Sequence, residues 1–446
     1  ADRLPATIEL VLVALVAAVA LGAFAGFIRA IPRFGALREI VALPPLVVRA
    51  IPVLVLAQAL QLALILWSHF SPAGISSGDS FDIGDRIAHL AVPALMLAIP
   101  FGAWASQIFY DGFRQPNSAL RTPLHRFGSS LATTAASIGP ALLSASLLVE
   151  VVTAWPGIGR LFFNGLSQSD FRIIAGVLLA YAACVVLLRL GDVLAPPAED
   201  TPSAIRSSRL SATGVVAIVL LAAGALGAVA ANAIAPIGPY FIDVAHWQGY
   251  PLAPGAGGHP LGTDENGRDL LARLLFGLRM SLGIAAFATL VAAAFAAVVA
   301  RAVPWFGDRA ALSVAGIRAF AALPFVMAAV LILAHRFGIG HVLSPVALAL
   351  IIAATVWPAL VPAFRQVTRA TLGVVVAVAG AALLLEVTLS MMGWGVQPPE
   401  PSLGNMLVLM QSNASTAPWA VLAPAIVATV MLFALYAIAD DLRESA

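Results

Sequence analysis

The 446-residue sequence has few charged side chains, one cysteine and no lysine. Only 10% of its residues are charged, whereas an average soluble domain carries about 25%. Most of the chain is therefore expected to face lipid or other buried helices. The single cysteine, Cys184, excludes an intrachain disulfide and a cysteine metal cluster.

The sequence also lacks the short motifs of phosphate-binding loops, zinc peptidases and serine hydrolases. Its seven histidines are spread over loops and the ends of apolar runs, which argues against a metal cluster. An intramembrane enzyme is therefore disfavoured. We expect no catalytic residues, no cofactor, no metal and no nucleic-acid partner.

Long apolar runs dominate what remains. A bilayer crossing takes about 20 apolar residues, and we identify runs of suitable length in both halves of the chain. They predict an all-α, polytopic membrane protein with about eleven transmembrane helices, and the odd number predicts a further span that precedes Ala1 or was lost. The runs are Thr7–Ile28, Ile40–Trp67, Leu90–Tyr110, Ser129–Thr153, Ile173–Leu188, Ser211–Ile234, Ser281–Ala300, Ala311–Ala334, Ser344–Phe364, Thr371–Met392 and Pro418–Ala439.

Arginine distribution predicts the orientation. When successive spans alternate in direction, most arginines fall on one side, which the positive-inside rule makes cytoplasmic. That side includes the C-terminus and the Pro- and Ser-containing segment 195–209, which reads as a flexible linker. The linker and the C-terminus are therefore expected on the cytoplasmic side of the membrane.

Sequence repeats divide the chain into two similar parts. The heptapeptide Arg29-Ala-Ile-Pro-Arg-Phe-Gly35 recurs as Arg301-Ala-Val-Pro-Trp-Phe-Gly307, and Pro52 and Pro324 keep the same spacing to it. We therefore expect two tandem membrane units with the same orientation, residues 1–194 and 210–446, joined by the linker. Two such units can form a pore along their shared interface, which favours transport.

Three longer motifs carry most of the specificity. The first is Glu-Val-Val-Thr-Ala-Trp-Pro-Gly-Ile-Gly at 150–159, and the second is His-Pro-Leu-Gly-Thr-Asp-Glu-Asn-Gly-Arg-Asp at 259–269. The third runs from Leu385 to Pro399 and contains Gly-Trp-Gly-Val-Gln-Pro-Pro. Together they closely resemble the permease subunits of dipeptide, oligopeptide and nickel ABC importers, with a B-type and a C-type permease fused in one chain.

This resemblance implies a membrane permease subunit that is not itself an enzyme. It implies a translocation pathway for peptides or similar solutes, an extracytoplasmic substrate-binding protein or lipoprotein as partner, and two ABC ATPase subunits. The residues expected to dock that protein or line the outer pathway are Glu150, Trp155, Pro156, Gly157, Gly159, Gly262, Thr263, Asp264, Gly267, Arg268, Asp269, Glu386, Gly393, Gly395, Gln397, Pro398 and Pro399.

Two of these regions leave alternatives open. Residues 261–279 mix apolar and charged positions at helical spacing, so we expect a helix along the outer surface, capped by Thr263 or Asp264. A bracing role on the outer face is favoured over direct contact with substrate. Glu150 and Glu386 each precede a Gly-x-Gly by seven residues. They either fix the shape of that loop or line the mouth of a pathway.

The resemblance fails at the cytoplasmic face. The Glu-Ala-Ala-x-x-x-Gly pattern that marks the family's ATPase-coupling loop is absent, and little loop remains in the second half. This predicts degenerate coupling loops and an alternative function, an ATPase-uncoupled membrane scaffold that holds a binding-protein-like partner. The residual loop residues are Arg114, Arg121, Arg126, Arg365 and Arg369.

Overall fold

The computed structural model divides the chain into two compact units, unit 1 (Ala1–Glu199) and unit 2 (Asp200–Ala446). The residues described are helical in the main and contain no β-strand. They are residues 3–31, 44–68, 73–76, 83–114, 123–168, 170–194, 211–235, 237–246, 249, 251–305, 344–365, 367–408 and 416–444.

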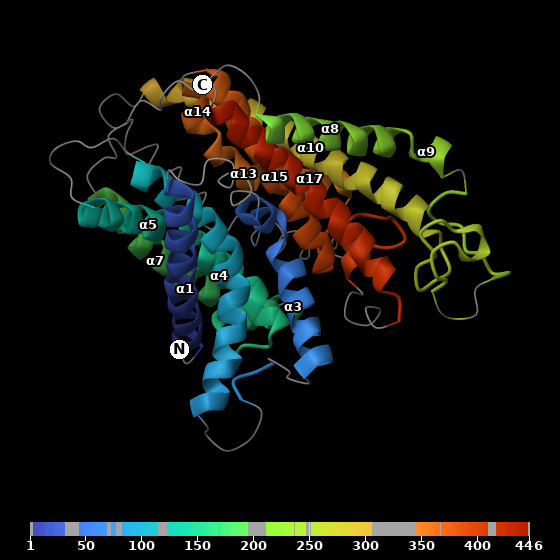
Figure 1. Cartoon of the computed structure of the whole chain (residues 1–446), viewed down its shortest axis with the longest axis horizontal. Coiled ribbons are helices and arrows are strands. Elements are labelled where there is room, and N and C mark those ends of the chain that lie inside the picture. The colour runs from blue at the N-terminus through green and yellow to red at the C-terminus, as the bar shows by residue number, and fades with distance from the viewer. Residues whose placement is uncertain are drawn as a thin grey trace. The chain divides into compact units, whose positions relative to one another are not determined.

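The described part of unit 1 consists mainly of long helices (Figure 1). The shorter α6 connects α5 and α7 and is the most amphipathic of the set. The helices are α1 (Leu4–Ala30), α3 (Val53–Ser68), α4 (Ile83–Arg114), α5 (Pro123–Val152), α6 (Ile158–Ser167) and α7 (Phe171–Leu194).

The described part of unit 2 combines four long helices with several short ones (Figure 1). An irregular segment between α9 and α10 carries the second sequence motif. The helices are α8 (Ala212–Val229), α9 (Ala231–Ile234), η2 (Ala256–Gly258), α10 (Leu270–Ala302), α13 (Pro345–Val356), η4 (Trp357–Ala359), α14 (Val361–Arg365), α15 (Arg369–Met391), η5 (Asn405–Leu407) and α17 (Pro418–Glu444).

The described helices bear out an all-α, polytopic membrane protein. Seven are long and apolar enough to cross a bilayer, or eight if the bent pair Pro44–Ala50 and Val53–Ile65 forms one span. The expected span Ala311–Ala334, Pro324, the linker 195–209 and Arg121 lie outside the described residues.

Two runs that we expected to be continuous helices are broken at prolines, and a third, Ser211–Ile234, divides at Ala230 into α8 and α9. The run Ile40–Trp67 bends by 100° beside Pro52, and the run Ser344–Phe364 divides into α13, η4 and α14 around Pro358. Proline has no N–H to donate, and it disfavours helical geometry in the residue before it. The apolar runs hid these breaks because hydropathy does not register a missing donor.

The two units share a packing order. In unit 1, α1 ends at the first heptapeptide and contacts α4 and the Glu150-bearing α5. In unit 2, α10 ends at the second heptapeptide and contacts α13, α14 and the Glu386-bearing α15. This order supports the repeat, whose common orientation remains a prediction.

Glycines allow α1 and α4 to pack closely along their length (Figure 1). A Cβ at Gly22 would lie 2.4 Å from the Cβ of Ala105, and one at Gly26 would lie 2.8 Å from the Ser106 carbonyl oxygen. Lipid supplies no hydrophobic drive between helices, so such small-residue contacts hold membrane bundles together.

We expect Gly26→Ala to lower the melting temperature of the purified chain, because its Cβ would meet backbone atoms that cannot move aside. Overpacking of this kind costs about 1–3 kcal/mol. The matched control is Gly176→Ala in α7, where an added Cβ meets nothing within 4 Å. Equal melting temperatures for the two variants would show that α1 and α4 do not pack this closely.

Candidate functional site

The second sequence motif forms the start of α10 in unit 2. Asp269 caps this helix, since its Oδ1 accepts the N–H of Ala272 at 2.7 Å. The expected cap at Thr263 or Asp264 is therefore wrong. Thr263 instead accepts the N–H of Leu252 at 2.8 Å, which holds an upstream loop against the motif.

The expected surface helix over residues 261–279 is also corrected. Residues 261–269 are turns and isolated bridges, and α10 then runs unbroken for 33 residues from Leu270. Gly262 and Gly267 have φ of 79° and 75°, which side chains rarely tolerate. These glycines favour turns before the helix. Asp264 and Arg268, whose spacing suggested an amphipathic helix, lie in these turns.

Asp264 is the centre of a buried ionic cluster. Its Oδ1 accepts the N–H groups of Asn266 and Arg268, both at 2.9 Å. Its Oδ2 lies 2.7 Å from Nε of Arg268 and 3.1 Å from Nε of Arg273. Asp264 is only 5% exposed and Arg273 4%, so the ions compensate each other away from water.

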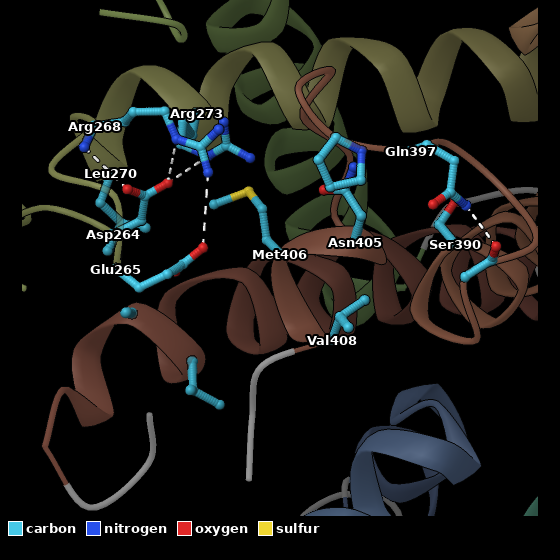
Figure 2. Close-up of a pocket in the computed structure, with 14 residues that line it drawn as sticks. Asp264, Glu265, Arg268, Leu270, Arg273, Ser390, Gln397, Asn405, Met406 and Val408 are labelled. Atoms are coloured by element: carbon cyan, nitrogen blue, oxygen red, sulfur yellow. Dashed lines mark hydrogen bonds and ion pairs between the residues drawn. The ribbon is translucent and has the colours of Figure 1, made fainter. Parts of the chain in front are cut away.

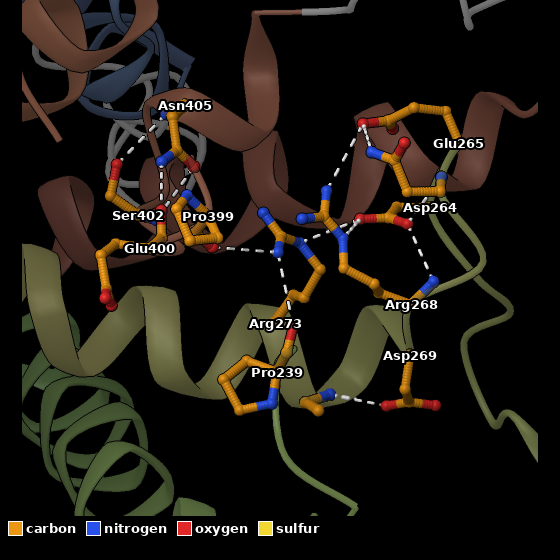
Figure 3. Close-up of polar contacts among 12 residues, drawn as sticks. Pro239, Asp264, Glu265, Arg268, Asp269, Arg273, Pro399, Glu400, Ser402 and Asn405 are labelled. Atoms are coloured by element: carbon orange, nitrogen blue, oxygen red, sulfur yellow. Dashed lines mark hydrogen bonds and ion pairs between the residues drawn. The ribbon is translucent and has the colours of Figure 1, made fainter. Parts of the chain in front are cut away.

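Arg273 connects this motif with the third one, as Figure 3 shows. Its Nη1 donates to the carbonyl oxygens of Pro239 and Pro399, at 3.4 and 3.5 Å. The structure thereby brings together, within unit 2, two motifs that are more than a hundred residues apart. Our sequence reasoning did not single out Arg273, although an arginine between apolar residues near the start of a mainly apolar helix was a visible signal.

The loop after α15 is held by its own polar network. The Asn405 side chain donates to the Val396 and Glu400 carbonyls and accepts the N–H of Ser402. Gln397 donates to the Gly393 carbonyl at 2.6 Å, and Gly393 has a φ of 81°. This network holds the loop that carries the third motif, whose Pro399 carbonyl accepts from Arg273.

Glu386 supports the same loop from below. It is fully buried and accepts a hydrogen bond from Ser390 Oγ at 2.8 Å, and Ser390 Oγ accepts the N–H of Val396 at 3.0 Å. A Cβ at Gly395 would lie 2.3 Å from Ser390 Oγ. The second Gly-x-Gly is thus coupled to its glutamate through a serine that the sequence reasoning missed.

In unit 1, Glu150 contacts its loop directly. The buried carboxylate accepts the N–H of Gly159 at 2.6 Å and the hydroxyl of Thr7 at 2.6 Å. A Cβ at Gly157 would lie 2.3 Å from this carboxylate. Trp155 donates to the Ala6 carbonyl at 3.0 Å, so the loop also fixes the start of α1. These contacts favour loop bracing over a pathway role for Glu150.

A histidine pair lies beside the α10 cap and was not among the expected site residues. His259 Nδ1 lies 2.7 Å from Oδ2 of Asp269, and its Nε2 lies 3.2 Å from Oδ2 of Asp243. Oδ2 of Asp243 also lies 2.7 Å from Nδ1 of His246. Burial lowers the pKa of His259, but the hydrogen bonds and charges of the two aspartates outweigh it and leave the pKa above 6.5. Among the described residues, no group of three or more acidic, histidine or cysteine side chains is placed to hold a metal.

The described residues that we expected in the coupling loops lie at or near helix ends, outside the three motifs. Arg114 ends α4 and Arg126 lies in the first turn of α5. Arg365 ends α14, and Arg369 begins α15 behind the capping box of Thr368 and Thr371. The described part of the α14–α15 connection is as short as the sequence indicated.

We expect Glu150→Ala to destabilise the chain, because it removes the acceptor for the buried Gly159 N–H and the Thr7 hydroxyl. Each stranded donor costs roughly 1–3 kcal/mol. The control is Glu9→Ala in α1, which removes a half-exposed pair with Arg86 that is worth at most about 1 kcal/mol. Equal melting temperatures for Glu150→Ala and Glu9→Ala would show that Glu150 does not brace the loop.

The His259 cluster predicts a pH dependence of stability. Because the pKa of folded His259 is raised, its stabilising effect is complete below about pH 6.5, the unfolded pKa, and is lost as pH rises through the folded pKa. The difference in melting temperature between the native chain and His259→Asn should therefore be larger at pH 5.5 than at pH 9. A difference that is constant or grows with pH would contradict the ionic role.

Comparisons with known proteins agree with the motifs. No protein-family model matches the chain. A Brucella suis protein named a peptide transport system permease is 28% identical over 222 residues, covering 42% of this chain and 72% of the relative. The oligopeptide transport system permease protein OppC of Mycobacterium tuberculosis is 28% identical over 280 residues, covering 51% and 89%.

A second Brucella suis protein, named a peptide permease, is 24% identical over 212 residues, which cover 43% of this chain and 66% of that protein. Such permeases are membrane subunits of ABC transporters and not enzymes. Together with the polytopic helical fold, these similarities relate the chain to the permeases of peptide ABC transporters.

Proposed function

We propose that the chain forms the translocation pathway of a peptide importer, with unit 1 as a B-type and unit 2 as a C-type permease fused in one polypeptide. It would work in the bacterial cytoplasmic membrane with its C-terminus inside, receive solute from an extracytoplasmic binding protein and couple to two ATPase subunits. The observation that carries the docking part is the ionic cluster of Asp264, Arg268 and Arg273.

This cluster suits a docking surface because it makes the base rigid and leaves polar groups at the edge. Asp264 and Arg273 are buried, whereas Asn266 is exposed and the Glu265 side chain is 33% exposed. A preorganised surface loses little conformational entropy on binding. Charged groups at its rim steer and orient a partner of complementary charge.

The same cluster joins the second and third motifs, both of which belong to the resemblance. Arg273 reaches Asp264 in the second motif and the carbonyl of Pro399 in the third. We infer that the two motifs form one binding surface, and that the Glu150 loop of unit 1 presents the corresponding surface of the other half. The glutamates act beneath these loops as braces.

A second candidate function is a membrane scaffold that binds the outer partner without ATP-driven transport. It is favoured by the connection from Arg365 to Arg369, which separates α14 and α15 by three residues. A coupling helix of several turns needs many more residues, at about 1.5 Å of rise each. The expected residues Arg114, Arg121 and Arg126 leave unit 1 as the remaining place for an ATPase contact.

Reconstitution into vesicles with the binding protein and the ATPase tests both functions. We expect Arg268→Gln to weaken binding of the outer protein roughly tenfold or more, because it loses the guanidinium contact to Asp264 that keeps the base of the surface rigid. Arg369→Ala should leave that binding unchanged. Binding protein that associates equally with the native chain and Arg268→Gln would contradict the docking assignment.

Uptake of a labelled peptide in the same vesicles separates the two candidates. ATP-dependent uptake by the native chain supports the importer, and its loss in Arg365→Ala or Arg369→Ala would show that the short connection couples. Retained binding without any ATP-dependent uptake supports the scaffold. Absence of both binding and uptake would contradict the two proposals together.

A further inference from the structure

A recess of about 260 Å³ lies in unit 2 between the start of α10, the loop after α15 and the start of α17. Figure 2 shows charged side chains gathered at one end and Ser390, Gln397 and Asn405 at the other, with Met406 between them. The charged end consists of Asp264, Glu265, Arg268 and Arg273. The recess therefore has a charged end, a polar end and an apolar middle.

The guanidinium groups at the charged end have donors to spare. Arg273 uses Nε for Asp264 and Nη1 for the carbonyls of Pro239 and Pro399. Among the described residues, its Nη2 has no hydrogen-bond partner, although the side chain is only 5% exposed. Arg268 uses Nε for Asp264 and Nη2 for Glu265, and its Nη1 likewise has no described partner. Neither nitrogen is among the buried side-chain atoms that lack a partner, so both are accessible and can donate to an acceptor in the recess.

Asp264 cannot supply that acceptor, because both of its oxygens are already occupied. Oδ1 accepts two backbone N–H groups and Oδ2 accepts from both arginines. A ligand oxygen in the recess can therefore accept from both arginines without competing with Asp264. A carboxylate fits best because guanidinium groups bind it with parallel hydrogen bonds, whereas a phosphate would bring a second negative charge next to Asp264 and Glu265.

The apolar part of the recess accommodates a hydrocarbon group beside that carboxylate. Its wall includes Met406, Val408, Ala420 and Val421. Val408 is 44% exposed, so it lies at the mouth. The volume is below the ~300–1,000 Å³ of pockets for drug-sized ligands, which suits a single residue with its carboxylate better than a whole oligopeptide.

We propose that this recess binds the C-terminal residue of a short peptide. The free carboxylate accepts from Nη2 of Arg273 and Nη1 of Arg268, and the last side chain packs on Met406 and Val408. The inference rests on the proposed function, since peptides are named in the relatives' descriptions. It adds a solute-binding site within the permease itself, next to the surface proposed for the binding protein.

Calorimetric titration of the purified full-length chain with trileucine and with trileucine amide tests the proposal. Amidation removes the negative charge and keeps the side chain, so the amide should bind roughly tenfold or more weakly. Equal binding of the two peptides, or no binding of trileucine, would overturn the inference.

A second comparison tests the location without touching the ionic cluster. Val408→Trp fills the mouth of the recess and should weaken trileucine binding to the level of the amide. Val244→Trp is the matched control, because Val244 is 76% exposed and does not line the recess. Both variants should keep the native melting temperature. Unchanged trileucine binding by a folded Val408→Trp would contradict the assigned site.

Uptake measurements keep this inference apart from the proposed function. ATP-dependent peptide uptake by a chain that binds trileucine and its amide equally would overturn the recess site and leave the permease function intact. Carboxylate-dependent binding without any uptake would support the site and count against the importer.

Discussion

The arrangement of the second and third motifs in unit 2 depends on one buried ion pair, between Asp264 and Arg273. The guanidinium is 3.1 Å from the aspartate and also reaches the carbonyls of Pro239 and Pro399. Isolated charges at this depth are unfavourable, and removing one partner of a buried pair typically costs about 3–5 kcal/mol. Arg273 therefore holds both the segment before α10 and the loop after α15 to α10. Loss of the Asp264–Arg273 pair is expected to loosen both segments.

A related constraint shapes the glycine loops that follow the two glutamates. In unit 1 the Gly157 and Gly159 backbone lies directly on the Glu150 carboxylate, so any side chain there would overlap it. In unit 2 the serine at position 390 lies between Glu386 and the loop. The repeated spacing thus encodes one structural solution in two forms, in which a buried acid organises the N–H groups of an irregular loop.

The sequence was sufficient to predict the helical membrane fold and the similarity to peptide permeases, whereas the tandem domains and the docking role of the three motifs remain predictions. Hydropathy and repeats report helices and their order directly. They could not reveal the breaks at Pro52 and Pro358, because apolar residues continue through both. Asp269 was expected at the site but not as the cap of α10, since several residues of the motif offer a suitable oxygen.

The contacts between distant motifs inside unit 2 were the least predictable feature. Arg273 and Pro399 are distant in sequence, and nothing in either motif indicates that a guanidinium joins them. Because Arg273 contacts both motifs, we propose that the two motifs form one cooperative surface. Native-state hydrogen exchange in an Asp264→Asn variant tests this most directly. If the surface is cooperative, the N–H groups of Val396 and Asn405 should exchange faster, as should that of Arg268. Loss of protection at Arg268 alone would contradict a cooperative surface.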